Sequence, residues 1–233
     1  MKALGDYIHS KGLKFGLYHA PREKTCDQYF NNRPGTSSNG NETRDAQLFA
    51  SWGGVDYVKH DWCDPRGTVQ EQAALFKKFG DALKATGRPI VYSINPPNSA
   101  HDNTAPTYSG WGGAFADMWR TSEDLKDAWS TGCPPSDQWC FVGITEALDI
   151  IEPMREWTKP GGQYNDPPDM LMVGVRNSLD ATENRAHMSM WAMLSAPLIA
   201  GNDIRNMSAD VRSVLTNRDV LAIDQDPLVR QAD

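Results

Sequence analysis

The chain has 233 residues, 39% hydrophobic and 23% charged, so it can bury a core of its own and does not have the composition of a disordered, collagen-like or coiled-coil protein. Its formal net charge is −7, from 23 Lys and Arg against 30 Asp and Glu, without a basic run. This balance argues against a surface for nucleic-acid phosphates or anionic lipids. No apolar stretch approaches the roughly 20 residues of a membrane-spanning helix, so we expect neither nucleic acid nor membrane as a partner.

The first half of the chain alternates helical and extended patterns. The hydrophobic periodicity predicts helices over residues 2–12, 42–52 and 68–86, and apolar strands over residues 13–19, 55–61 and 89–95. Short strands that alternate with helices predict a parallel sheet.

The second half continues this alternation less regularly. We predict strands over residues 117–121, 171–173 and 196–200 and helices over residues 123–129, 144–157 and 181–194, with a further strand end near residues 165–166. About six strands result, each ending in a polar or small residue. A (βα)8 barrel is favoured over a doubly wound sheet, because none of the glycine-rich motifs of nucleotide binding follows a strand.

Four cysteines can pair in three ways. The loop sequence between Cys133 and Cys140 would tolerate a short bridge, which would leave Cys26 and Cys63 for a second one. Four free thiols in a reducing compartment are the alternative. Disulfides favour an oxidising compartment and a secreted protein, and because the first residues lack the apolar block of a signal peptide, that signal would have to lie upstream.

Residues 56–63 carry the most informative chemistry of the chain. Alternate residues of a strand share a face, so Lys59 and Asp61 point to one side while Val58 and His60 point to the other. An ammonium group beside a carboxylate keeps it ionised, as a nucleophile must be. We therefore predict Asp61 as a catalytic carboxylate, with an ordinary surface ion pair as the alternative.

A second candidate carboxylate, Asp124, follows the strand predicted over residues 117–121. Arg120 at that strand end can bind hydroxyls or a carboxylate in a forked arrangement. Acidic residues at the start of a helix over residues 123–129 are the alternative interpretation. A glycosidase needs two carboxyl groups at its active site, and these two strand ends supply them. Tyr18 and Trp62 are candidate aromatic contacts for a sugar.

Metal sites and organic cofactors find no support in the sequence. The five histidines form no close pair, and no set of cysteines has the spacing of metal ligands. A nicotinamide-binding or phosphate-binding protein would need the glycine motifs that the chain lacks. We expect no metal and no cofactor.

Several separate blocks of the chain resemble glycoside hydrolase family 27, the α-galactosidase or melibiase family. They are residues 12–18 with 24–26 (GLKFGLY and KTC), 57–63 (YVKHDWC), 119–124 (WRTSED), 161–171 (GGQYNDPPDML), 195–205 (SAPLIAGNDIR) and 223–228 (IDQDPL). The blocks stand in the family's order and cover nearly all of the chain.

This resemblance implies a retaining exo-glycosidase on a (βα)8 barrel, with Asp61 as nucleophile and Asp124 as acid/base. It also implies a disulfide between Cys26 and Cys63. The residues implied to bind the sugar, orient the nucleophile or line the pocket are Tyr18, Lys59, Arg120, Asp169 and Met170. Trp62 and Asn95, which stand at strand ends, are further candidates for substrate binding, although the segment of Asn95 departs from the family's pattern.

Two parts of the family's pattern do not occur in this sequence. The family's first two strands, with an Asp pair that recognises galactose, and its C-terminal β-sandwich have no counterpart, so we expect residues 1–233 to form a single, incomplete barrel domain. Expected substrates are oligosaccharides or polysaccharides with terminal α-galactosides. A β-L-arabinopyranosidase and a catalytically inactive sugar-binding fragment are the alternatives, and the sequence does not indicate an oligomeric state.

Overall fold

A computed structural model describes residues 1–35, 37–64, 67–95, 112, 114–133, 140–152, 164–166, 169–229 and 231. The chain divides into two compact units. The first comprises residues 1–97 and 106–119, and the second comprises residues 98–105 and 120–233.

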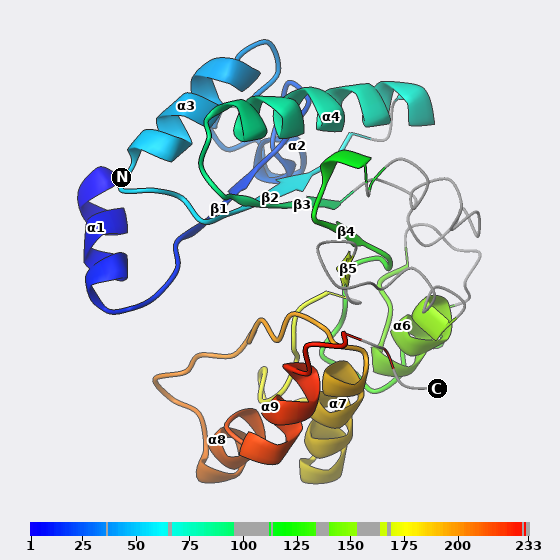
Figure 1. Cartoon of the computed structure of the whole chain (residues 1–233). Helices are drawn as coiled ribbons and strands as arrows, with labels where there is room; N and C mark the ends of the chain where they lie inside the picture. Colours follow the sequence, from blue (N-terminus) through cyan, green and yellow to red (C-terminus); the bar gives the residue numbers. More distant parts are fainter. Residues whose placement is uncertain are drawn as a thin grey trace. The chain divides into compact units, whose positions relative to one another are not determined.

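The first unit contains a parallel sheet whose strands follow chain order (Figure 1). These strands are β1 (Gly16–His19), β2 (Tyr57–Asp61), β3 (Val91–Asn95) and β4 (Met118–Arg120), the last of which ends at the boundary of the second unit. The helices of this unit are α1 (Lys2–Ser10), α2 (Cys26–Asn31), α3 (Glu42–Ser51) and α4 (Val69–Ala85). The expected α/β arrangement with a parallel sheet is confirmed.

The core of the first unit lies between the sheet and the helix pair α3 and α4 (Figure 1). Val58 and His60 are fully buried on the helix-facing side of β2, and the His60 ring lies 4.4 Å from the ring of Phe79. His60 also hydrogen-bonds to the hydroxyls of Ser38 (3.0 Å) and Tyr92 (2.8 Å). This buried polar group is therefore satisfied, and the other face of β2 is left for Lys59 and Asp61.

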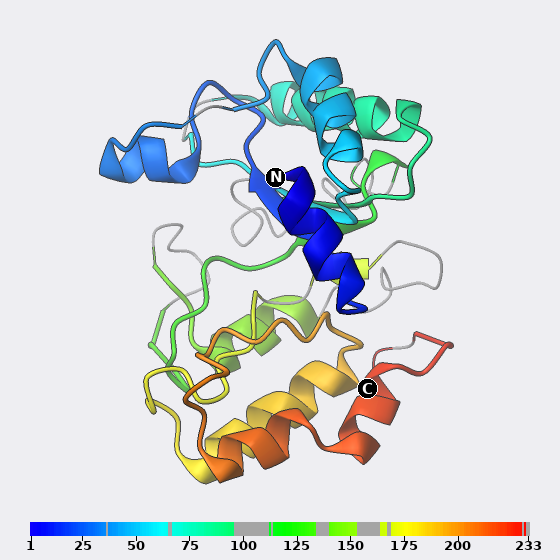
Figure 2. The same cartoon turned by 90° about the vertical axis from the view of Figure 1, so that its left-hand side faces the viewer.

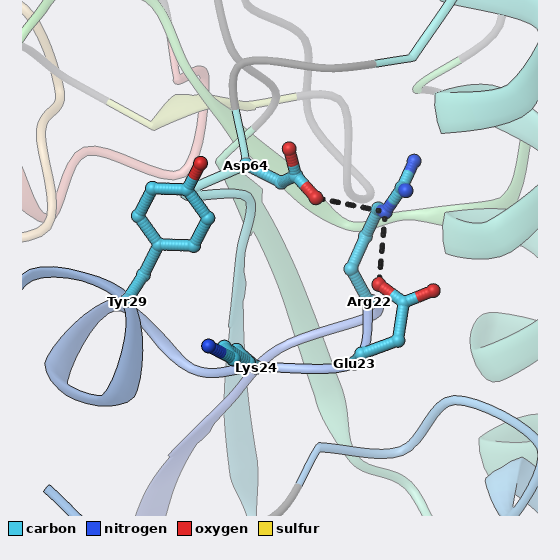
Figure 3. A pocket seen from close by; sticks show the side chains of 5 residues that line it. All are labelled: Arg22, Glu23, Lys24, Tyr29 and Asp64. Carbon is cyan, nitrogen blue, oxygen red and sulfur yellow. Dashed lines mark hydrogen bonds and ion pairs between the residues drawn. The ribbon is translucent and has the colours of Figure 1, made fainter. Parts of the chain in front are cut away.

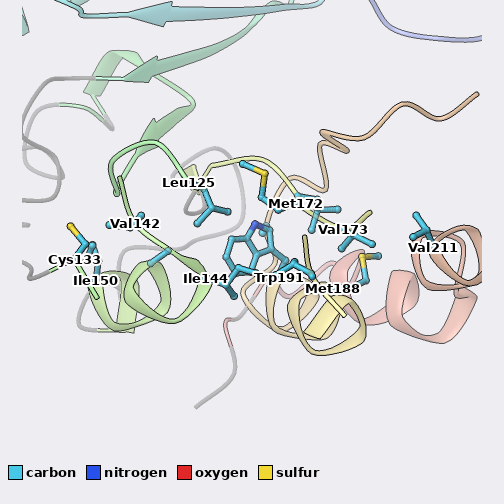
Figure 4. Packing of buried hydrophobic residues seen from close by; sticks show 14 residues of the cluster. Leu125, Cys133, Val142, Ile144, Ile150, Met172, Val173, Met188, Trp191 and Val211 are labelled. Carbon is cyan, nitrogen blue, oxygen red and sulfur yellow. The ribbon is translucent and has the colours of Figure 1, made fainter. Parts of the chain in front are cut away.

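The second unit consists mainly of helices: α6 (Ile144–Ile151), α7 (Ala181–Met193), α8 (Ala209–Leu215) and α9 (Arg218–Asp224), with strand β5 (Tyr164–Asp166). Helix α7 packs against α8 and α9 (Figure 2). Trp191 of α7 is fully buried at the centre of the apolar cluster of this unit (Figure 4). The start of α7 is fixed by a capping box, in which Asp180 accepts from backbone N–H groups and Glu183 reaches back.

Three predicted elements of the second unit are wrong. Residues 123–129 form no helix, because Leu125 pairs with Val142 in a parallel bridge and the backbone hydrogen bonds go there. The strands expected over residues 171–173 and 196–200 reduce to one bridge between Leu171 and Ala200. Helices α2, α8 and α9 were not predicted.

None of the helices in the described ranges combines the length and the hydrophobicity needed to cross a membrane. The single, incomplete barrel domain expected over residues 1–233 stays a prediction.

Candidate functional site

Asp61 is the last residue of β2, and both oxygens of its carboxylate accept hydrogen bonds. The Tyr18 hydroxyl of β1 donates to Oδ2 at 2.8 Å, and the Asn95 amide of β3 donates to Oδ1 at 2.7 Å. Asn95 stands directly opposite Asp61 in the strand register, and Tyr18 stands opposite Lys59 on the other side of β2. Two neighbouring strands therefore fix the orientation of this carboxylate.

Lys59 and Asp61 lie on the same face of β2, as predicted from the strand alternation. The alternative interpretation, an ordinary ion pair between them, is wrong: within the described residues, no ion pair joins the Lys59 ammonium to the Asp61 carboxylate. The Asp61 carboxylate is contacted instead by two neutral donors, the Tyr18 hydroxyl and the Asn95 amide.

Both predicted disulfides are present, so the alternative of four free thiols is wrong. Cys26 pairs with Cys63 and Cys133 with Cys140, with Cα–Cα distances of 5.0 and 5.8 Å. The Cys26 sulfur lies 3.3 Å from Asp61 Oδ2, so the first bridge ties the start of α2 to the residues that follow the carboxylate. Cys26, Asp61 and Cys63 are close enough to share a metal ion, but the disulfide removes both thiolates that such a site would need.

Arg120 organises a second cluster of charged side chains, in the second unit. Its buried guanidinium contacts Asp124 Oδ1 at 2.9 Å and Asp169 Oδ2 at 3.1 Å. Asp169 also accepts a hydrogen bond of 3.0 Å from the backbone N–H of Leu125. Because the Asp124 side chain is 63% exposed and lies outside any helix, the helix-start interpretation is wrong.

The remaining predicted contacts differ in their exposure. Met170 is 39% exposed, next to Asp169. Trp62 is buried at 5%, with its ring against Phe76 and beneath the Arg22 guanidinium. Its burial leaves little of the ring for a sugar face.

One pocket among the described residues was not predicted. Its lining side chains come from the loop after β1, from α2 and from the end of β2: Arg22, Glu23, Lys24, Tyr29 and Asp64 (Figure 3). Of these positions only Lys24 belongs to a block of the family resemblance, and the assembly of the loop and the helix brings the five side chains together.

Comparison with known proteins gives consistent results. The model of the α-galactosidase A family matches residues 1–226. The chain is 40% identical to α-galactosidase A of Cellvibrio japonicus over all its 233 residues, which are 52% of that protein. The α-galactosidase of Saccharomyces cerevisiae, whose structure is also known with raffinose, superposes with a TM-score of 0.85 at 33% identity over 98% of this chain and 50% of the yeast chain.

A β-L-arabinopyranosidase of the same glycoside hydrolase family, from Geobacillus stearothermophilus, is less similar. It has a TM-score of 0.68 at 25% identity, covering 96% of this chain and 57% of that protein. The chain spans about half the length of the curated relatives it matches.

Proposed function

Because the chain belongs to glycoside hydrolase family 27, the α-galactosidase or melibiase family, we propose that it supplies the catalytic residues of a retaining exo-glycosidase acting on terminal α-D-galactosides. Asp61 is the nucleophile and Asp124 the acid/base. The observation that carries this assignment is the two-sided hydrogen bonding of Asp61 at the carboxyl end of a parallel strand.

Hydrolysis proceeds in two displacements. In the first, an oxygen of Asp61 attacks the anomeric carbon, the bond to the leaving oxygen breaks, and the proton of Asp124 passes to that oxygen. In the second, Asp124 takes a proton from water, the water oxygen attacks the same carbon, and the ester to Asp61 breaks. The two carboxyl groups are expected about 5–5.5 Å apart in the active enzyme.

The other family residues support these two carboxylates. Arg120 is oriented by Asp169, so it can present donors to sugar hydroxyls near Asp124. Tyr18 holds the nucleophile. Lys59, Asn95, Asp169 and Met170 are proposed to bind the sugar or line its pocket, whereas the ring of Trp62 is buried and is no longer proposed as a sugar contact. The two disulfides support an oxidising compartment and therefore secretion.

A β-L-arabinopyranosidase is the second candidate activity, favoured by the similarity to the Geobacillus enzyme. Its substrate is an α-galactoside without the exocyclic hydroxymethyl group. The higher similarity to α-galactosidases favours the galactoside. The third candidate function is sugar binding without catalysis. It is considered because the chain spans only about half the length of its relatives.

The test is release of nitrophenol from the α-D-galactoside and the β-L-arabinopyranoside. Asp61→Asn is expected to lower kcat on the order of a thousandfold, as removal of a nucleophile does. Asp81→Asn is the matched control, because Asp81 is an exposed carboxylate on α4 paired with Lys77. Equal rates in wild type and Asp61→Asn would contradict the assignment. A folded but inactive wild-type chain would favour the sugar-binding alternative.

A further inference from the structure

Buried polar groups form a hydrogen-bond network around His60, on the helix-facing side of β2. The ring of His60 is fully buried, with Nδ1 2.8 Å from the Tyr92 hydroxyl of β3 and Nε2 3.0 Å from the Ser38 hydroxyl. The Tyr92 hydroxyl also contacts the Phe76 carbonyl of α4 at 3.0 Å. The backbone N and the Oγ of Ser38 each lie 3.0 Å from the Ala20 carbonyl. All five residues belong to the first unit.

The acceptors of this network decide where its protons lie. The Phe76 carbonyl can only accept, so the Tyr92 hydroxyl donates to it and receives a hydrogen bond from His60 Nδ1–H. Nε2 of the neutral ring then accepts from the Ser38 hydroxyl, because the Ser38 N–H already donates to the Ala20 carbonyl. Burial holds the pKa of His60 well below its usual value, so the ring stays neutral. Both ring nitrogens are therefore fixed in one tautomer.

This network joins the carboxyl ends of the three strands that supply the hydrogen bonds of the proposed nucleophile. His60 directly precedes that residue in β2. Ala20 follows β1, two residues after Tyr18, and Tyr92 lies in β3, three residues before Asn95. Tyr18 and Asn95 donate to the two oxygens of the nucleophile at 2.8 and 2.7 Å, so both contacts depend on the spacing of these strand ends.

The side chains of the network extend the connection beyond the backbone pairing of β1. The register of β1 against β2 ends with His19 opposite His60. Past this pair, Ser38 connects the Ala20 carbonyl to the His60 ring. The position of the end of β1 relative to β2 therefore depends on a hydrogen bond that His60 accepts.

We propose that His60 is a positioning residue for hydrolysis, which holds the ends of β1, β2 and β3 at the spacing at which Tyr18 and Asn95 donate to Asp61. The inference rests on the proposed function, because it takes Asp61 as the nucleophile. It goes beyond that function by assigning a role in turnover to a side chain on the opposite face of the strand from the carboxylate.

The test breaks the network on either side of His60 with little change in packing. Tyr92→Phe and Ser38→Ala each remove one hydroxyl, and kcat and KM are measured on the full chain with whichever nitrophenyl glycoside it hydrolyses. Rates are divided by the folded fraction from circular dichroism, so a loss of stability alone leaves kcat unchanged. We expect kcat about tenfold lower and KM within about twofold, because misplaced reacting groups slow the chemical step more than they weaken binding.

Replacement of the histidine itself adds a rescue experiment. Glutamine can donate and accept hydrogen bonds, whereas leucine can do neither, so His60→Gln should keep a higher kcat than His60→Leu. Val58→Ala is the matched control, because Val58 is fully buried on the same face of β2 and its side chain has no polar group. It should lower the Tm and leave kcat within about twofold.

A double variant separates positioning from general destabilisation. If Tyr92 acts on turnover through Asn95, adding Tyr92→Phe to Asn95→Ala should lower kcat by less than about twofold further. A full further tenfold loss, an unchanged kcat in Tyr92→Phe and Ser38→Ala, or an equal loss in Val58→Ala would each overturn the proposal. Failure of the proposed function has a different signature: equal rates in wild type and Asp61→Asn, or a folded wild-type chain without hydrolysis, would overturn both.

Discussion

Replacement of Asp169 separates the roles of its charge and its hydrogen bond. Its carboxylate accepts from the Leu125 N–H and contacts the Arg120 guanidinium, and its backbone has a φ of 62°. Asparagine has nearly the same shape, tolerates a positive φ and can still accept from Leu125, so Asp169→Asn removes only the charge. Alanine removes the acceptor as well and is strained at this φ.

The two variants should differ clearly in the free energy of unfolding. A hydrogen bond to a charged partner is stronger than a neutral one by about 1–1.5 kcal/mol, so Asp169→Asn should cost about 1–2 kcal/mol. Arg120 keeps Asp124 as a partner, which limits the loss. Asp169→Ala also leaves the Leu125 N–H unsatisfied and adds backbone strain, so its cost should be about 3–7 kcal/mol.

Urea unfolding followed by tryptophan fluorescence measures both costs. Trp191 is a suitable probe, because its indole N–H donates to the Asp169 carbonyl at 3.3 Å in the same unit. Equal destabilisation by the two variants, or a cost of Asp169→Ala below about 1 kcal/mol, would refute this account of the cluster.

Three further predictions concern stability. Burial lowers the pKa of His187 to about 3 from 6.5, so between these pH values the unfolded chain binds a proton that the native one does not. The free energy of unfolding should therefore fall with falling pH in this window, by up to about 1.4 kcal/mol per pH unit from this group. In urea titrations, the free energy of unfolding of His187→Gln should depend less on pH than that of the wild type. Replacing Cys26 and Cys63 by serine removes a crosslink between residues 37 positions apart in the sequence and should lower the free energy of unfolding in urea by about 4 kcal/mol. An unchanged free energy of unfolding would contradict this prediction. Gly201→Ala places a Cβ 2.7 Å from Met170 Sδ and should cost roughly 1–3 kcal/mol, visible as a lower Tm; an unchanged Tm would show that the contact relaxes freely.

The sequence predicts the regular elements best where local periodicity and tertiary packing agree. The helix expected over residues 68–86 is α4 (Val69–Ala85), because its apolar face and its capping residues point to the same limits. Residues 123–129 are the contrary case. Their acidic start resembles a helix N-terminus, but the pairing of Leu125 with Val142 is a contact across 17 residues that local pattern does not contain.

The candidate site shows the same division. Strand alternation predicts that Lys59 and Asp61 share a face, and this is confirmed. It does not predict which side chains reach the carboxylate, because Tyr18 and Asn95 are brought there by the register of β1 and β3 against β2. The pattern within a single strand does not specify how that strand is aligned with its neighbours, so the register could not be predicted from it.

The hydrogen bond from Asn95 to Asp61 has a consequence for altering the sugar preference of this chain. A residue at the end of β3 is an obvious target for changing which sugar is accepted. The same amide donates to an oxygen of the carboxylate that we assign as nucleophile. Selectivity and turnover are therefore coupled at this position, and variants of Asn95 selected for a new sugar should lose rate unless another donor restores the contact.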